Sequence, residues 1–268
     1  MINDNDINQH NQQTWNSGAY QAWVNRFGTP QEAAAKIKDN PAKRLGSLYK
    51  HFGPEIQGKR VMNLLGSNGN KAVALALLGA DVTVADYSAD NERYAGELAE
   101  AAGVTVRYVL ADVLHLPEAE AAGQYDIVMM ENGILHYFHD LQPLFRVAAD
   151  LLTKGGRLVL QDFHPVSTKL ISSKGTTANI RKHKVTGDYF DTSLQEKDAS
   201  FSKYLGEGGD ELESERKVLL RNWTLGEIVT AVAQVGLFIR TLEELPNQSS
   251  ETFDKGIPKT FTVIAEKL

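Results

Sequence analysis

The sequence predicts an α/β fold with a doubly wound, mostly parallel sheet, and three observations carry this prediction. Short apolar runs alternate with stretches of helical periodicity between Arg60 and Phe163. The first run, residues 60–65, is followed by a turn with two glycines at residues 66–69 and then by a helical stretch. Several runs end on an acidic residue. Because ligands of such sheets bind beyond the carboxyl ends of the strands, these acidic residues mark the expected site.

The expected elements follow the chain in a regular order. Strands are expected at residues 60–65, 81–85, 104–110, 125–130, 157–163, 237–242 and 261–265, and helices at 70–79, 89–102, 140–152 and 224–234. Residues 1–13 are polar and are expected to be frayed. Further helices are expected to begin at Thr29-Pro30 and at Asn40-Pro41, the second running to about His51. The domain prediction is an N-terminal helical cap, residues 1–58, and one domain of residues 59–268.

The segment of about residues 164–221 interrupts this order. It is polar and rich in lysine, and it ends in a strand-like run from Lys217 to Arg221. So long an interval without an α/β unit is usually a functional loop, a lid or disorder. We therefore expect a lid insertion after the fifth strand, with some β structure. The basic run 181–184 is expected to be a solvated loop, although it is also able to attract an anionic substrate.

Composition narrows the classes of function. The chain has 268 residues, 42% of them hydrophobic, which suits one α/β domain with additions. It has no cysteine, which excludes disulfides and thiolate metal sites, and no apolar run near the ~18 residues of a membrane span. A net charge of -6 argues against nucleic-acid binding. We expect a cytoplasmic protein with a small-molecule substrate and no membrane partner, and the sequence leaves the oligomeric state open. No metal is expected, because Asp162 and Glu131 lack a third spaced ligand.

The turn at residues 66–69 predicts a cofactor site. A turn between a buried strand and a helix aims backbone N–H groups and the positive end of the helix at one point, which suits a carboxylate or a phosphate. Asp86 ends the next strand, where a carboxylate is placed to accept hydrogen bonds from ribose hydroxyls. By position, the acidic groups Asp112, Glu131 and Asp162 reach the same edge of the sheet.

These motifs resemble those of the class I S-adenosylmethionine-dependent methyltransferases. The run Asn63-Leu64-Leu65-Gly66-Ser67-Asn68-Gly69 is similar to the family's first motif, but Asn63 stands at its acidic position and only Gly69 of its three glycines is in register. Asp86-Tyr87 matches the second motif, Asp112-Val113 the third, and Glu131-Asn132 the motif after the fourth strand. The resemblance covers about residues 59–163, and less closely residues 223–268. It implies a Rossmann-like sheet of seven strands with a final antiparallel strand.

The resemblance implies S-adenosylmethionine as cofactor and assigns its contacts. Residues Gly66, Ser67, Asn68 and Gly69 would receive the methionine end, Asp86 the ribose, and Asp112 and Val113 the adenine, and the further cofactor contacts are Tyr87, Glu131 and Asn132. The departures at Asn63 and Ser67 have two interpretations: drift inside a working site, or loss of turnover in a relative that only binds or regulates.

Two histidines are candidates for the catalytic base. His136 lies at the mouth of the sheet and His164 follows the fifth strand, and an imidazole is able to take a proton from a nucleophile near neutral pH. Either histidine also has a structural interpretation: His136 is able to fix its loop or stack near the cofactor, and His164 precedes Pro165 in a turn. Trp15, Tyr20 and Trp23 are able to close over the sulfonium or simply to pack a helical cap.

The function predicted from the sequence is methyl transfer from S-adenosylmethionine to an O or N atom of a small molecule. The first alternative is a non-catalytic protein that binds the cofactor to regulate or scaffold. A nicotinamide-dependent oxidoreductase is the second alternative. It is less favoured because the turn lacks the Gly-x-Gly-x-x-Gly pattern and Asp112 has no required part in dinucleotide binding.

Overall fold

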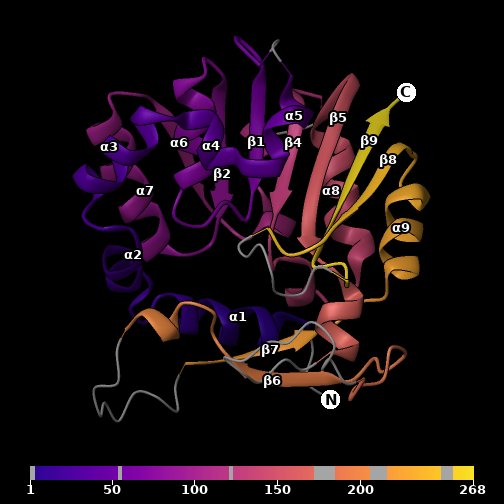
Figure 1. The fold of residues 1–268 in the computed structure, drawn as a ribbon. Coiled ribbons are helices and arrows are strands. Elements are labelled where there is room, and N and C mark those ends of the chain that lie inside the picture. The colour runs from indigo at the N-terminus through magenta and orange to yellow at the C-terminus, as the bar shows by residue number, and fades with distance from the viewer. Residues whose placement is uncertain (1–3, 54–55, 121–122, 172–184, 206–215, 249–255) are drawn as a thin grey trace.

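A seven-stranded sheet forms the centre of the molecule (Figure 1). The structure, a computed structural model, describes residues 4–53, 56–120, 123–171, 185–205, 216–248 and 256–268. In spatial order the strands are β3 (Val106–Leu110), β2 (Asp81–Asp86), β1 (Arg60–Leu64), β4 (Tyr125–Glu131), β5 (Leu152–Phe163), β9 (Thr260–Lys267) and β8 (Leu237–Leu245). Strands β1 to β5 pair in parallel, and β9 runs antiparallel between β5 and β8. The predicted fold class is confirmed, including the antiparallel last strand.

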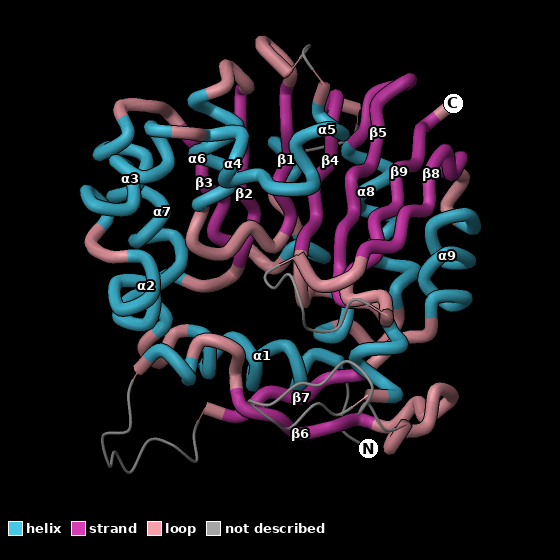
Figure 2. Tube along the Cα trace, viewed as in Figure 1, coloured by secondary structure: helices cyan, strands magenta, loops and turns pink. Residues whose placement is uncertain are grey.

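Helices cover both faces of this sheet (Figure 2). The helices of the described residues are α1 (Asp4–Trp15), which lies at the end of the sheet and not on a face, α2 (Ala19–Phe27), α3 (Pro30–Asp39), α4 (Pro41–Leu45), α5 (Tyr49–Phe52), α6 (Asn70–Leu77), α7 (Ala89–Ala102), α8 (Leu141–Leu151) and α9 (Leu225–Gln234). Strand β1 shows why the sheet is buried on both sides. Val61 packs into the apolar cluster that contains α3, α6 and α7, whereas Met62 and Leu64 pack into the cluster that contains α8 and α9. This alternation is the pattern of a central strand in a parallel sheet.

Local sequence signals account for the helix starts. Thr29 and Glu32 form a capping box at α3, and Thr224 and Glu227 form another at α9, as the sequence predicted for both starts. The prediction of a single helix from Asn40-Pro41 to about His51 is wrong. This segment is divided into α4, a short 3₁₀ turn and α5, because Gly46 takes a φ of 60° at the break.

The N-terminal residues differ most from the prediction. Residues 1–13 were expected to be frayed, but α1 is a helix that begins at Asp4. Its Asn11 side chain completes the edge of strand β7 (Lys217–Arg221): Nδ2 donates to the Leu219 carbonyl at 3.2 Å, and Oδ1 accepts from the Leu219 N–H at 2.9 Å. The Thr14 hydroxyl donates to the Lys217 carbonyl at 2.8 Å. Contacts made far along the chain therefore order this segment.

We expect Asn11→Ala to destabilise the packing of α1 on β7. The substitution leaves the partly buried N–H and carbonyl of Leu219 without these partners, which costs about 1–3 kcal/mol of unfolding free energy. Urea unfolding measures the loss, and hydrogen exchange at the Leu219 amide locates it. The control is His10→Ala, because the His10 side chain is exposed on the same helix. Equal stability of the two variants would contradict the prediction.

The segment after β5 forms a second, smaller sheet. Strands β6 (Leu194–Asp198) and β7 pair antiparallel and lie with α1 across the carboxyl ends of the parallel strands (Figure 1). The buried Lys169, in the helical turn Val166–Leu170, donates to the carbonyls of Asp191 at 2.5 Å and Asn222 at 2.9 Å. This anchors the segment on both sides of the β6–β7 pair. The basic run 181–184 lies outside the described residues.

A search for membrane-spanning helices in the described part of the chain finds no helix with the length and apolarity that a span requires.

Candidate active site

The turn after β1 is closed by hydrogen bonds to the neighbouring strand. The Gly69 N–H donates to the Gly66 carbonyl at 3.1 Å, and the Ser67 N–H donates to Asp86 Oδ2 at 3.0 Å. A Cβ on Gly66 would stand 2.7 Å from Asn63 Oδ1, and one on Gly69 would stand 2.7 Å from the Ala95 Cβ. The two glycines let the turn pack closely against β1, β2 and α7, so Gly66, although shifted from the family register, is required by this packing.

The backbone explains where the turn departs from the family motif. The motif's three glycine positions fall on Leu65, Ser67 and Gly69, and these residues have φ values of 50°, 49° and 69°. The turn therefore keeps the left-handed geometry although two of its three positions carry a side chain. A left-handed conformation costs a residue with a Cβ roughly 1–2 kcal/mol. The side chains at residues 65 and 67 therefore add strain to the turn but do not change its conformation.

Two opposite substitutions test this strain. Ser67→Gly is expected to raise the unfolding free energy by about 0.5 kcal/mol, because relief of the left-handed strain slightly exceeds the entropy cost of glycine. Gly69→Ala is expected to lower it by about 2–4 kcal/mol, since strain and the contact with Ala95 both oppose it. Denaturant unfolding measures both. A Ser67→Gly protein less stable than the parent would show that the side chain stabilises the turn.

Asp86 organises the site from beneath. Its carboxylate is 5% exposed, and it accepts hydrogen bonds from the N–H groups of Ser67 and Ser88, each at 3.0 Å, and from Asn91 Nδ2 at 3.3 Å. Asn91 Oδ1 in turn accepts from Trp23 Nε1 at 2.8 Å. Burial raises the pKa of Asp86, and the N–H donors oppose that shift. Because Ser67, Ser88 and Asn91 all donate hydrogen bonds to Asp86, the site stabilises its deprotonated form.

A cleft of about 890 Å³ lies over the turn and the strand ends. Of the predicted cofactor contacts, those lining it are Gly66, Ser67, Asn68, Asp86, Tyr87, Glu131 and Asn132. Asp112 and Val113 line a narrow cavity of about 30 Å³, which shares Leu65, Asp86 and Tyr87 with the cleft. Gly69 lines neither cavity and packs against α7 instead. Nine of the ten predicted cofactor contacts thus line one of two cavities that share part of their walls.

The far side of the turn is held by an ion pair. Lys71, near the start of α6, pairs with Glu131 at the end of β4, and both side chains are 17% exposed. Asn132 Nδ2 also donates to Glu131 Oε2 at 3.2 Å, and Asn132 has a φ of 50°. Glu131 is therefore neutralised by a cation of the protein itself.

His136 does not itself line the cleft, but it lies next to residues that do. Its ring Cε1 stands 3.4 Å from where a Cβ on Gly133 would be, and its ring meets that of Tyr137 edge-on at 4.6 Å; Gly133 and Tyr137 both line the cleft. Burial lowers the pKa of His136, while the charge of Asp162 opposes that shift. Within the described residues its ring nitrogens make no hydrogen bond. An imidazole in this state is neutral at pH 7 and able to accept a proton.

His164 is placed differently. It is 3% exposed; its Nε2 lies 2.5 Å from Glu244 Oε1, and its Nδ1 accepts from the Val166 N–H at 3.1 Å. It does not line the cleft. With both nitrogens engaged, it is suited to holding the end of β5 rather than to moving a proton.

Sequence reasoning missed Asp162 as an anchor of the loop before His136. Its carboxylate, 4% exposed, accepts from the N–H groups of Gly133, Ile134 and Leu135, with distances of 2.5 to 3.2 Å. The acidic ending of β5 was a visible signal, but three consecutive backbone donors are visible only in the fold.

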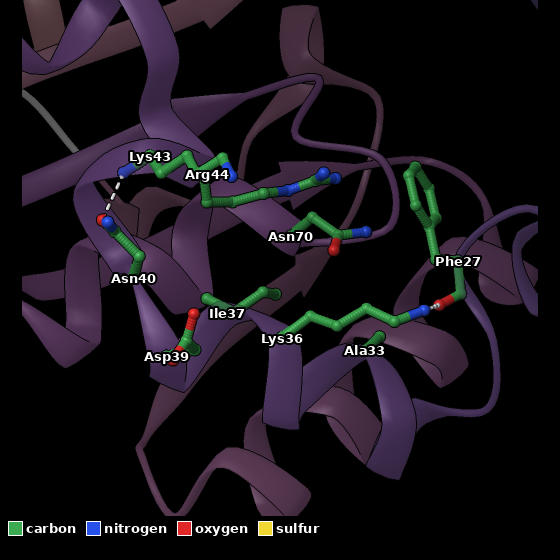
Figure 3. A pocket seen from close by; sticks show the side chains of 9 residues that line it. All are labelled: Phe27, Ala33, Lys36, Ile37, Asp39, Asn40, Lys43, Arg44 and Asn70. Carbon is green, nitrogen blue, oxygen red and sulfur yellow. Dashed lines mark hydrogen bonds between the residues drawn. The ribbon is translucent and has the colours of Figure 1, made fainter.

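Arg44 is the second residue that the sequence did not mark. It lines the cleft together with the turn, and its Nε is buried without a hydrogen-bond partner. Burial lowers the pKa of the guanidinium; Glu131 opposes that shift and Arg26 adds to it. Figure 3 shows Arg44 beside Asn70 and Phe27 at one end of a neighbouring cavity of about 400 Å³. No sequence pattern distinguishes this arginine from a solvated one, because its burial depends on how α4 packs.

Comparison with known proteins identifies the matched region. Residues 61–156 match a family described as a methyltransferase domain. The chain is 30% identical to 27-O-demethylrifamycin SV methyltransferase of Amycolatopsis mediterranei over 156 residues, covering 56% of this chain and 53% of that protein. It is 36% identical to demethylmenaquinone methyltransferase of Thermus thermophilus over 112 residues, covering 40% and 48%. The chain spans about half the length of the curated relatives it matches.

Solved structures extend the likeness of fold to most of the chain. A putative S-adenosylmethionine-dependent methyltransferase from Listeria monocytogenes superposes with a TM-score of 0.63 at 20% identity, covering 85% of this chain and 99% of that one. Magnesium protoporphyrin IX methyltransferase from Synechocystis, with bound S-adenosylmethionine, gives a TM-score of 0.58 at 14% identity and covers 100% and 99%. Residues 61–156 therefore match a methyltransferase domain, and the sheet order and these likenesses show that the chain has the Rossmann-like fold of S-adenosylmethionine-dependent methyltransferases.

Proposed function

We propose that this protein transfers a methyl group from S-adenosylmethionine to a hydroxyl oxygen of a small molecule. The observation that carries the proposal is the cleft itself, in which a glycine turn, a buried carboxylate and an arginine without a carboxylate partner in the described residues face one space. Relatives named as O-methyltransferases, among them ubiquinone biosynthesis O-methyltransferases, favour oxygen over nitrogen as the acceptor atom.

The residues of the cleft fit the cofactor. A buried Arg44 Nε without a partner calls for an anion, and the methionine end of S-adenosylmethionine carries a carboxylate. Asp86, which lines the cleft, is the acceptor for the ribose hydroxyls, and Asp112 and Val113 line the place for the adenine. The narrow cavity at Asp112 has to widen for a base to enter, which side-chain rotation of Tyr87 or Tyr137 would allow.

The protein's own part in the reaction is to align, to exclude water and to remove a proton. When bound, the cofactor supplies the methyl group and carries the leaving group for its transfer. Trp15, Trp23 and Tyr137 line the cleft and keep water from the acceptor. His136 takes the proton of the acceptor hydroxyl, and Asp162 holds the loop on which His136 lies. The described parts of the segment, residues 164–171, 185–205 and 216–221, form the cover over the acceptor together with α1.

Two measurements test the proposal. Calorimetry with S-adenosylhomocysteine measures cofactor binding, and incubation with methyl-labelled S-adenosylmethionine and a panel of hydroxylated metabolites measures transfer. We expect both to be positive. Binding without transfer to any acceptor would favour a regulatory or scaffolding protein, and failure to bind would remove the assignment of the cleft.

A further inference from the structure

Among the described residues, the side chains that line the cleft carry more positive than negative charge, although the whole chain is negative. The chain has a net charge of -6, yet the cations lining the cleft are Arg26, Arg44, Lys71, Lys203 and Lys259, against the carboxylates of Asp86 and Glu131. Glu131 is paired with Lys71, which leaves Asp86 as the remaining carboxylate among the described residues that line the cleft. In the described part of the chain, Arg26, Arg44 and Lys203 form no ion pair with a carboxylate. Positive charge is therefore left over inside the cleft.

Three of these cations alternate with two aromatic rings along one wall. The Arg44 Cζ lies 4.8 Å from the centre of the Phe27 ring, and the Arg26 Cζ lies 4.6 Å from the same ring. Arg26 also lies 4.7 Å from the centre of the Tyr204 ring, and the Lys203 Nζ lies 5.1 Å from that ring. We name this series, Arg44-Phe27-Arg26-Tyr204-Lys203, the cation–ring stack. It joins α2 and α4 to the 3₁₀ turn Ser202–Tyr204 of the cover.

The cation–ring stack holds like charges close together. Ring faces attract cations and make the arrangement tolerable, but they do not cancel the repulsion between neighbouring guanidinium groups. The link between α2 and the cover is further fixed by Asn25 Nδ2, which donates to the Tyr204 carbonyl at 2.8 Å. A fixed group of cations that faces a cleft is completed by an anion from outside the protein.

The cofactor accounts for only one of these cations. Arg44 lies with the turn and takes the methionine carboxylate in the proposed function, which leaves Arg26 and Lys203 on either side of Tyr204. S-adenosylmethionine also carries an ammonium and a sulfonium, so its binding makes the cleft more positive. An acceptor with a negative charge is then favoured, and a cationic acceptor is excluded by repulsion.

The same wall is aromatic as well as cationic. Trp23 stacks on Trp15 at 6.2 Å and on Phe27 at 6.0 Å, and it lies 6.2 Å from Tyr204. Flat rings pack well against such side chains. We propose that the methyl acceptor is an anionic aromatic hydroxy compound, whose carboxylate or phosphate binds Arg26 and Lys203 beside Tyr204. This inference rests on the proposed function, because it assigns the acceptor side of the same cleft.

The test compares matched probes on protein saturated with S-adenosylhomocysteine. The probes are protocatechuate, its uncharged amide and catechol monophosphate, and calorimetry measures each dissociation constant at low and high salt. We expect at least one anion to bind about tenfold or more tightly than the amide, with the difference shrinking as salt increases. The anion that binds more tightly identifies the anionic group of the acceptor as a carboxylate or a phosphate. An amide that binds as tightly as both anions, or the absence of binding by all three probes, overturns the inference.

Paired variants locate the anion site. We expect Arg26→Gln with Lys203→Gln to reduce the affinity for the preferred anion at least about tenfold, while the affinity for S-adenosylhomocysteine stays within twofold. Both side chains are exposed, so the fold should tolerate the change. The control is Lys43→Gln, which removes one positive charge from the neighbouring cavity of Figure 3 and none from the cleft. Equal anion affinities in the double variant and the control overturn the inference.

The two proposals fail in different ways. If the parent protein does not bind S-adenosylhomocysteine, the proposed function fails. If it binds S-adenosylhomocysteine but does not discriminate by charge among the probes, only the anionic acceptor fails.

Discussion

Asp86→Ala is expected to weaken the binding of S-adenosylhomocysteine by about a hundredfold or more. Loss of charge-assisted hydrogen bonds in a buried site costs roughly 3 kcal/mol, and the turn residue Ser67 loses the acceptor of its N–H as well. Calorimetry measures the affinity. Circular dichroism on the same sample shows whether the variant is folded, because an unpaired Ser67 and Ser88 N–H also lower stability by about 2–4 kcal/mol.

A carboxylate at the other end of the sheet supplies the control for Asp86. Asp126 Oδ2 accepts from the Arg60 N–H at 2.8 Å, so Asp126→Ala also removes a carboxylate that bonds the backbone, but at the start of β1 rather than at its end. Its affinity for S-adenosylhomocysteine should match that of the parent. A folded Asp86→Ala protein with unchanged affinity would show that the ribose is bound elsewhere.

His136→Gln is expected to lower kcat by about 10²- to 10⁴-fold, the usual contribution of a general base, with little change in cofactor affinity. The acceptor for this measurement is any compound labelled in the transfer assay. Because glutamine has no basic nitrogen but is close in size, the loss reports proton transfer rather than packing. A variant that keeps most of the parent kcat would remove His136 from the mechanism.

The pH profile gives a second readout for His136. A base must be deprotonated to act, so kcat/KM should fall as pH decreases through the His136 pKa, which burial lowers from its ordinary value of 6.5. The parent profile is therefore expected to be flat above neutral pH and to have its midpoint below 6.5, and His136→Gln should lose this limb. The comparison variant is His164→Gln, whose nitrogens hold Glu244 and Val166. It should lose stability but keep the limb.

The sequence predicted the sheet well because the signals were local. Apolar runs such as Arg60–Leu64 are long enough to be read as buried strands, and the capping box of Thr29 and Glu32 fixes a helix start within four residues. The predicted first and last residues of the elements were less accurate where tertiary contacts decide where an element begins or ends. Strand β5 begins at Leu152 rather than at residue 157, next to a register shift in its pairing with β4.

The sequence predicted where the acidic side chains lie in the fold, but not which groups they contact. The order of strands places Asp86 and Glu131 at one edge, and the structure confirms that they line one cleft. The partners come from the N-terminal helices: Trp23 reaches Asn91 across 68 residues, and Arg44 reaches the turn after β1. No periodicity in the sequence encodes such pairings, since they depend on how the helices pack. For the same reason α1, with its asparagine- and glutamine-rich sequence, looked unstructured.

The bond between Asn11 and Leu219 has a consequence for how the protein is made. It joins residues 208 positions apart, so α1 leaves the ribosome well before its partner strand. At a synthesis rate of ~5–20 residues per second, that interval is roughly 10–40 s. A nascent chain that stops before residue 219 would contain strands β1 to β5 and the turn after β1. Its strand β7 would be incomplete, so the cover over the carboxyl ends of the strands could not form.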